Sequence, residues 1–119
     1  MTPRSTPPAA DAGLAELEYR ILVTLADGPS HGYAIGKELE AKSGGRMNPT
    51  TGTLYQALKR LTAAGWIEPS AGVAAGGGDA RRKVFALTRA GARAVAEEAR
   101  RLESLVQAAR RKKLYPAPR

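Results

Sequence analysis

The stretch NPTTGTLYQALKRLTAAGWIE, residues 48–68, opens with small hydroxyl side chains and continues as a regular amphipathic helix. Gly65 predicts the end of this helix, because glycine readily adopts the left-handed conformation that terminates helices. The start is open, since a side-chain oxygen of Asn48, Thr50 or Thr51 can each accept the hydrogen bond of a free amide. The buried stripe of the helix is predicted at Leu54, Leu58 and Leu61.

Two shorter helices precede this stretch. Apolar residues at helical spacing predict the first over residues 14–25, and Asp27-Gly28-Pro29 ends it. Ser30 is the predicted N-cap of the second helix, which ends at Ser43-Gly44-Gly45. From the second helix we expect Tyr33, Ile35 and Leu39 to point inward.

Two short strands and a long helix follow. The strands, residues 66–70 and 82–87, flank the glycine-rich loop AGVAAGGGDA and predict a β-hairpin. From Thr88 to about Lys113 the composition predicts one uninterrupted helix. The fold class is therefore mainly α with a small β-hairpin, a winged helix-turn-helix plus a long C-terminal dimerisation helix. We expect a disordered tail over 1–13, the winged helix-turn-helix domain over 14–88, the dimerisation helix over 89–113 and a tail over 114–119.

Composition excludes several classes of protein. The chain has 119 residues and a formal charge of +8, which indicates one small domain attracted to polyanions. It has no Cys, and its single His31 has no ligand neighbours at metal-binding spacing, so we expect no metal and no cofactor. Without a cluster of acid, base or nucleophile the chain is predicted not to be an enzyme. No apolar run approaches the roughly 18 residues of a membrane span, which predicts a cytoplasmic protein without a membrane partner.

The threonines fit a helix that enters the major groove of DNA. Free amides at a helix N-terminus attract phosphate, and small hydroxyl side chains let the backbone approach closely. Thr51, Tyr55 and Gln56 are predicted to face bases, whereas Lys59 and Arg60 come late in the helix and are predicted to contact phosphates. The predicted DNA-binding set is Tyr33, Lys37, Thr50, Thr51, Thr53, Tyr55, Gln56, Lys59, Arg60, Arg81, Arg82 and Lys83.

The last helix carries apolar residues in alternating steps of four and three, the pattern of a helix-packing seam. We expect a second copy of the chain to cover this seam together with the outward face of the first helix. The predicted dimer interface is Leu14, Leu17, Ile21, Val95, Ala99, Leu102, Val106 and Ala109. Residues 89–119 hold nine basic and three acidic side chains. Glu97 is expected to pair with Arg100 or Arg101, and residues 110–113 to complement the helix dipole.

Three segments in this order resemble the PadR-like transcriptional regulators: DGPSHGYAIGKELE, GTLYQALKRLTAAGWIE and RRKVFALTRAG. The resemblance spans about residues 14–90. It implies a dimeric repressor that binds a palindromic operator in double-stranded DNA and releases it when a small effector binds. By resemblance, Tyr33 and Tyr55 occupy family motif positions, and residues 81–83 form the basic edge of the wing. The alternative reading is a winged-helix module that mediates protein or RNA assembly, since a fold does not settle a function.

Overall fold

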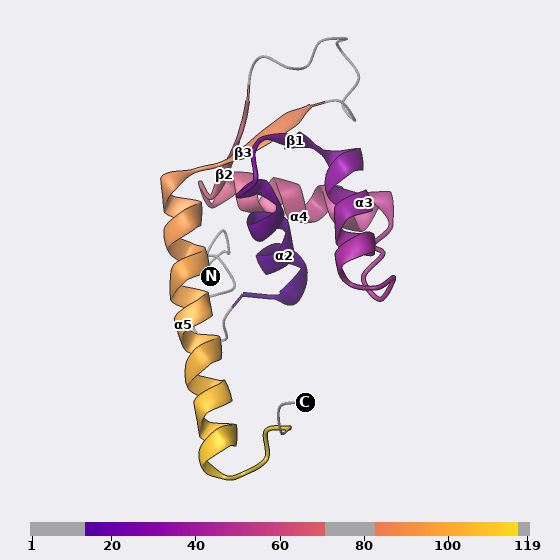
Figure 1. Cartoon of the computed structure of the whole chain (residues 1–119). Coiled ribbons are helices and arrows are strands. Elements are labelled where there is room, and N and C mark those ends of the chain that lie inside the picture. Colours follow the sequence, from indigo (N-terminus) through magenta and orange to yellow (C-terminus); the bar gives the residue numbers. More distant parts are fainter. Residues whose placement is uncertain (1–13, 71–82, 117–119) are drawn as a thin grey trace, which may run out of the picture.

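The computed structural model describes residues 14–70 and 83–116, so the predicted tail over 1–13, the tip of the hairpin and the last three residues lie outside it. The helices are α2 (Glu16–Leu25), α3 (Gly32–Lys42), α4 (Thr51–Ala63) and α5 (Arg89–Arg111). The strands are β1 (Ser30–His31), β2 (Ile67–Pro69) and β3 (Val84–Leu87). Figure 1 shows α2, α3 and α4 gathered beneath the small sheet, while α5 runs along one edge of the molecule. This is the predicted winged helix-turn-helix with a long C-terminal helix.

The sheet has one strand more than the sequence predicted. Its order is β1-β3-β2, all antiparallel, with Ile67 opposite Leu87 and Ser30 opposite Phe85. The prediction of Ser30 as a helix cap was wrong, because the N-cap of α3 lies one residue later. His31 caps α3 instead, and its Nδ1 accepts a hydrogen bond from the N–H of Ala34 at 3.3 Å. The connection between the first two helices is thus tied to the hairpin.

One apolar core joins the three short helices to the hairpin. Its largest fully buried side chains, each less than 2 % exposed, are Ile21, Leu22, Ile35, Leu39, Leu58, Leu61 and Ile67. The predicted stripe of α4 is confirmed, since Leu54, Leu58 and Leu61 are all buried. Gly65 adopts a positive φ of 80° directly after the helix, which fits its predicted role as terminator.

The start of α5 is fixed to the turn between α4 and β2 through Thr88. Its Oγ1 donates to the carbonyl of Gly65 at 2.6 Å and accepts from the N–H of Gly91 at 3.0 Å, so one hydroxyl caps α5 and bonds the turn. A side chain at Gly91 has no room, because an added Cβ would lie 2.8 Å from Leu87 Cδ1 and closer still to the carbonyl oxygen of Trp66. The long helix therefore leaves the domain in a defined direction.

A buried carboxylate ties α5 to the N-terminal end of the domain. Glu98 is only 6 % exposed, and Arg101 donates to it at 2.7 Å. The Arg101 guanidinium, together with the N–H of Leu14, holds the pKa of the Glu98 carboxyl below its usual value of 4.5. Glu97 was expected to pair with Arg100 or Arg101. Arg101 binds Glu98 instead, because Glu98 lies on the buried face of α5 and needs a counter-charge.

The contact that sets α4 against α3 joins Gly32 to Tyr55. The Tyr55 hydroxyl is buried, and a Cβ added to Gly32 would lie 2.6 Å from Tyr55 Cζ and nearer still to the hydroxyl oxygen. Farther along the same interface, a Cβ at Gly36 would touch Leu54 Cδ2 at 3.4 Å. Because Gly32 and Gly36 have no side chains, α4 packs closely against α3.

Gly32→Ala should force Tyr55 or the whole of α4 to move, at a cost of about 1 to 3 kcal/mol in the free energy of unfolding. The cost should be smaller in a Tyr55→Leu background, because leucine lacks the outer ring atoms that meet the new methyl group. Gly52→Ala is the matched control, since Gly52 also lies in the first turn of a helix but has open space around it. Urea unfolding of the four variants measures this coupling; equal costs of Gly32→Ala in both backgrounds would contradict the contact.

Glu98→Gln should make stability less dependent on acid pH. Because folding lowers the pKa of Glu98, its ionised form stabilises the protein above the usual value of 4.5, and this contribution is lost as pH falls through the lower folded-state pKa. The difference in unfolding free energy between wild type and variant should therefore shrink between pH 7 and the acid side of 4.5. Glu103→Gln on the exposed side of α5 is the control. A difference that stays constant with pH would speak against the buried pair.

Candidate nucleic-acid interface

The exposed face of α4 is formed by Gly52, Gln56 and Lys59. These residues follow one another at steps of four and three, so they share the side of the helix opposite the leucine stripe, and all three are exposed. Gly52 adds no side chain, so the helix backbone can approach a ligand closely there. Gly52 was not among the predicted residues; an exposed glycine within a helix, which weakens that helix, was the signal that could have revealed it.

The threonines form the open end of this helix. Thr50 is the N-cap, which decides between the three predicted starts, and its Oγ1 accepts from the N–H of Thr53 at 3.2 Å. The same hydroxyl bonds Thr53 Oγ1 at 3.1 Å. Thr50, Thr51 and Thr53 are all exposed, so small hydroxyl groups surround the positive end of the α4 dipole.

The N-terminal half of α3 flanks this end. Tyr33 is 65 % exposed, so the prediction that it points inward was wrong. Lys37 lies one helical turn later, with its Nζ 5.8 Å from the centre of the Tyr33 ring. Both side chains line a hollow whose opposite wall includes Asn48 and Thr51. A cation and an aromatic ring thus stand beside the threonines.

A second hollow separates α4 from the hairpin. Lys59 and Thr62 line it from α4, and Pro69 of β2 and Lys83, which precedes β3, line it from the hairpin. Two lysines on opposite walls suit a phosphate backbone that passes between a helix and a wing. Arg81 and Arg82, predicted beside Lys83, lie outside the described residues.

Two predicted contact residues have other partners within the chain. Tyr55 packs against Gly32 and the core with its hydroxyl buried, so its predicted contact with bases is corrected. Arg60 binds Glu18 of α2, a carboxylate only 3 % exposed, through Nη2 and through Nε at 3.1 Å. A buried carboxylate without this partner would be strongly destabilising, so Arg60 links α2 to α4. Its side chain is still 51 % exposed, and its phosphate contact stays a prediction.

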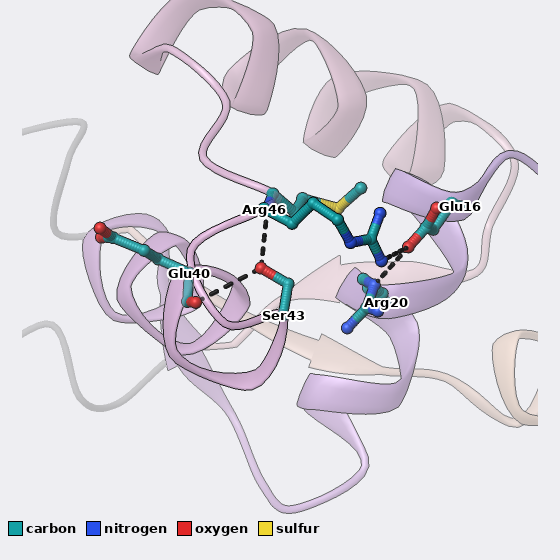
Figure 2. A network of polar contacts seen from close by, with 6 residues as sticks. Glu16, Arg20, Glu40, Ser43 and Arg46 are labelled. Atoms are coloured by element: carbon teal, nitrogen blue, oxygen red, sulfur yellow. Dashed lines mark hydrogen bonds and ion pairs between the residues drawn. The ribbon is translucent and has the colours of Figure 1, made fainter.

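The segment between α3 and α4 is held by polar contacts (Figure 2). Arg46 reaches back to Glu16 of α2 at 3.3 Å, and Arg20 binds the same carboxylate oxygen at 2.8 Å. The hydrogen bond from Arg20, with Arg46 nearby, lowers the pKa of Glu16 below its usual value. Ser43 Oγ donates to the carbonyl of Glu40 and accepts from the N–H of Met47 at 2.8 Å. The chain therefore enters α4 along a fixed path.

Other kinds of site have little support in the described part of the chain. In residues 14–70 and 83–116, no group of three or more His, Cys, Asp or Glu side chains could hold a metal ion. None of the helices in these two ranges is long and apolar enough to cross a membrane.

The solved structures that resemble this chain include DNA-binding regulators. A transcriptional regulator from Clostridium thermocellum shares 25% identity at a TM-score of 0.67, over 80% of this chain and 87% of that chain. RosR of H. salinarum shares 31% identity at a TM-score of 0.64, over 82% of this chain and 80% of that chain. PadR of Bacillus subtilis, solved in complex with operator DNA, shares 27% identity at a TM-score of 0.58, over 69% of this chain and 45% of that chain.

A sequence relative and a family model complete the comparison. An uncharacterized 37.1 kDa protein in transposon TN4556 of Streptomyces fradiae is 40% identical over 90 residues, or 76% of this chain. The chain spans only 24% of the length of that relative. The model of the transcriptional regulator PadR-like family matches residues 21–97, from α2 into α5. The chain therefore belongs to the PadR-like family of transcriptional regulators.

Proposed function

We propose that this chain is a dimeric repressor that binds a palindromic operator in double-stranded DNA and releases it when a small effector binds. The observation that carries the DNA-binding part is the exposed face of α4, where Gly52, Gln56 and Lys59 continue the threonine-capped end. This face combines a close backbone approach, a hydrogen-bonding amide and a cation, which are the elements of base and phosphate recognition. The similarity to Bacillus subtilis PadR, which was solved in complex with operator DNA, supports the proposal that this chain binds DNA. Repression and effector release rest on the family resemblance.

Each residue of the interface has a distinct role in this proposal. Gln56 reads a base edge, since its amide can donate and accept at the same time and lies on the outermost line of α4. Thr51 and Thr53, with the free amides of the first turn, bind phosphate. Lys59 and Lys83 hold the backbone strand that passes between α4 and the hairpin.

The second half of α5 supplies the proposed dimer seam. Among the described residues, 14–70 and 83–116, no helix or strand covers α5 beyond Glu98, and Leu102 is 38 % and Leu105 54 % exposed. Val106 and Ala109 lie on the same side and are partly exposed. Two copies that pack along this stripe would bury it and present two recognition helices about 34 Å apart, one turn of B-DNA.

The interface expected from the sequence needs correction at its domain end. Ile21 is 0 % and Leu14 only 8 % exposed within one chain, so both belong to its own core. Leu17 and Val95 also pack against that core, although they are not completely buried. Ala99, Leu102, Val106 and Ala109 remain as proposed seam residues, and Leu105 joins them.

Selection of bound duplexes from a random-sequence pool should recover a palindromic motif. On the selected site, Gln56→Ala should cost roughly 1 to 3 kcal/mol of binding free energy and relax the preference at one position of each half. Lys59→Ala should weaken selected and random DNA alike, and Gln107→Ala on α5 is the matched control. Fluorescence anisotropy with both duplexes measures these effects. Gln56 would lose its proposed role if its substitution weakened both duplexes equally.

Leu102→Glu should produce monomers, because two buried carboxylates would face each other across the two-fold axis. Ala96→Glu introduces the same charge at an exposed position of α5 outside the proposed seam, about a third of a turn from Leu102, and should leave the dimer intact. Light scattering gives the mass of each variant, and anisotropy gives its affinity for the selected site. A Leu102→Glu variant with unchanged dimer mass would refute the seam.

A further inference from the structure

The face of α5 that points away from the seam carries a line of arginines. Arg89, Arg93, Arg100 and Arg111 follow one another at steps of four, seven and eleven residues, which an α-helix brings to one side. We call these four residues the arginine rail. All four side chains are exposed, and in the described part of the chain none of them pairs with a carboxylate. The rail is opposite the seam formed by Leu102 and Val106, so it stays accessible in the proposed dimer.

Local helix electrostatics does not account for the rail. Cations stabilise the C-terminal end of a helix and destabilise the N-terminal end, where the dipole is positive. Arg89 is the first residue of α5 and Arg93 follows one turn later, while the first turn contains no acidic residue to offset them. Glu97 and Glu103, each three residues from Arg100, place negative charges next to the middle of the rail. Two arginines thus stand where they oppose helix formation, which points to a use other than stability.

The geometry of the rail suits the phosphate backbone of duplex DNA. From Arg89 to Arg111 it spans about 33 Å, close to the roughly 34 Å of one turn of B-DNA. Guanidinium groups bind phosphates through paired hydrogen bonds, and a row of them releases counterions from the DNA. Figure 1 shows that α5 runs along the edge of the molecule, away from α3 and from the exposed end of α4. The rail and the exposed face of α4 therefore meet different DNA phosphates.

We propose that the arginine rail is a second DNA-binding surface, which contacts backbone phosphates outside the operator. The DNA is the flank of the same molecule that α4 binds, and capture of a second duplex is the other outcome that the test distinguishes. This inference rests on the proposed function in one respect: the exposed face of α4 binds the DNA whose phosphates the rail contacts.

The test compares two variants of the full chain that lose the same charge. Arg89→Gln, Arg93→Gln and Arg100→Gln together remove three cations from the rail. Arg110→Gln, Lys112→Gln and Lys113→Gln remove three from the end of the same helix. Thermal unfolding of both shows that the fold persists, and the rail variant should be as stable as wild type or more stable, because it loses the unfavourable charges at the start of α5.

Two duplexes that carry a bound sequence from the selection distinguish the surfaces: one of about 20 bp, which holds only the two half-sites, and one of about 60 bp that adds flanks. The rail variant should bind the long duplex about tenfold or more weakly, with a salt dependence reduced by about three phosphate contacts, and bind the short duplex like wild type. If the rail takes a second molecule instead, immobilised short duplex loaded with wild type should capture free labelled duplex, and the rail variant should not.

The proposal is overturned if the rail variant keeps the affinity and salt dependence of wild type in both assays, or if the control triple variant loses as much. It is also overturned if the rail variant loses only binding to anionic lipid vesicles, which would identify a membrane as the partner. Failure of the operator proposal looks different: duplex selection would give no motif, and Gln56→Ala would have no preferential effect, whatever the rail does.

Discussion

The close contact between Gly32 and Tyr55 determines which side of α4 is exposed. Because α3 has no side chain at Gly32, the Tyr55 ring and hydroxyl fill that space. With Tyr55 in this position, the leucines of α4 face the core. In the same orientation of α4, Gly52, Gln56 and Lys59 face outward. Two motifs that are separate in the sequence, His31-Gly32-Tyr33 and Gly52-Thr53-Leu54-Tyr55, are therefore two halves of one packing interface.

Buried carboxylates determine which cations are paired within the described part of the chain. Glu18 takes Arg60, and Glu98 takes Arg101, since a carboxylate with so little exposure requires a counter-charge. Lys59 and the four arginines of the rail have no such partner among the described residues. The distribution of accessible positive charge thus follows from the pairing of two acidic residues, more than from the formal charge of +8.

Much of the fold could be predicted from sequence, because long apolar periodicities report directly on burial. The leucine stripe of α4, the glycine at its end and the length of α5 are local patterns of this kind. The two-residue strand β1 has no pattern long enough to read, so Ser30 was taken for a cap.

Some site residues have roles that depend on partners distant in the sequence, and the sequence alone could not predict these roles. Lys59 and Arg60 look equivalent in the sequence, yet only Arg60 meets a buried carboxylate, which lies on another helix. Tyr55 was taken for a base contact because the space beside Gly32 exists only after α3 and α4 have packed. Such roles depend on tertiary contacts, which helical periodicity does not encode.

Chemical cleavage of bound DNA shows directly whether the threonine-capped end of α4 faces DNA. The chain contains no Cys, so Thr51→Cys gives a single attachment point for an iron chelate that cleaves nearby DNA. Val23→Cys, an exposed position on α2, serves as the control. We expect a chelate at residue 51 to cleave within the major groove of both half-sites and a chelate at residue 23 to cleave neither. Bound DNA that is cut from residue 23 and spared by residue 51 would contradict this expectation.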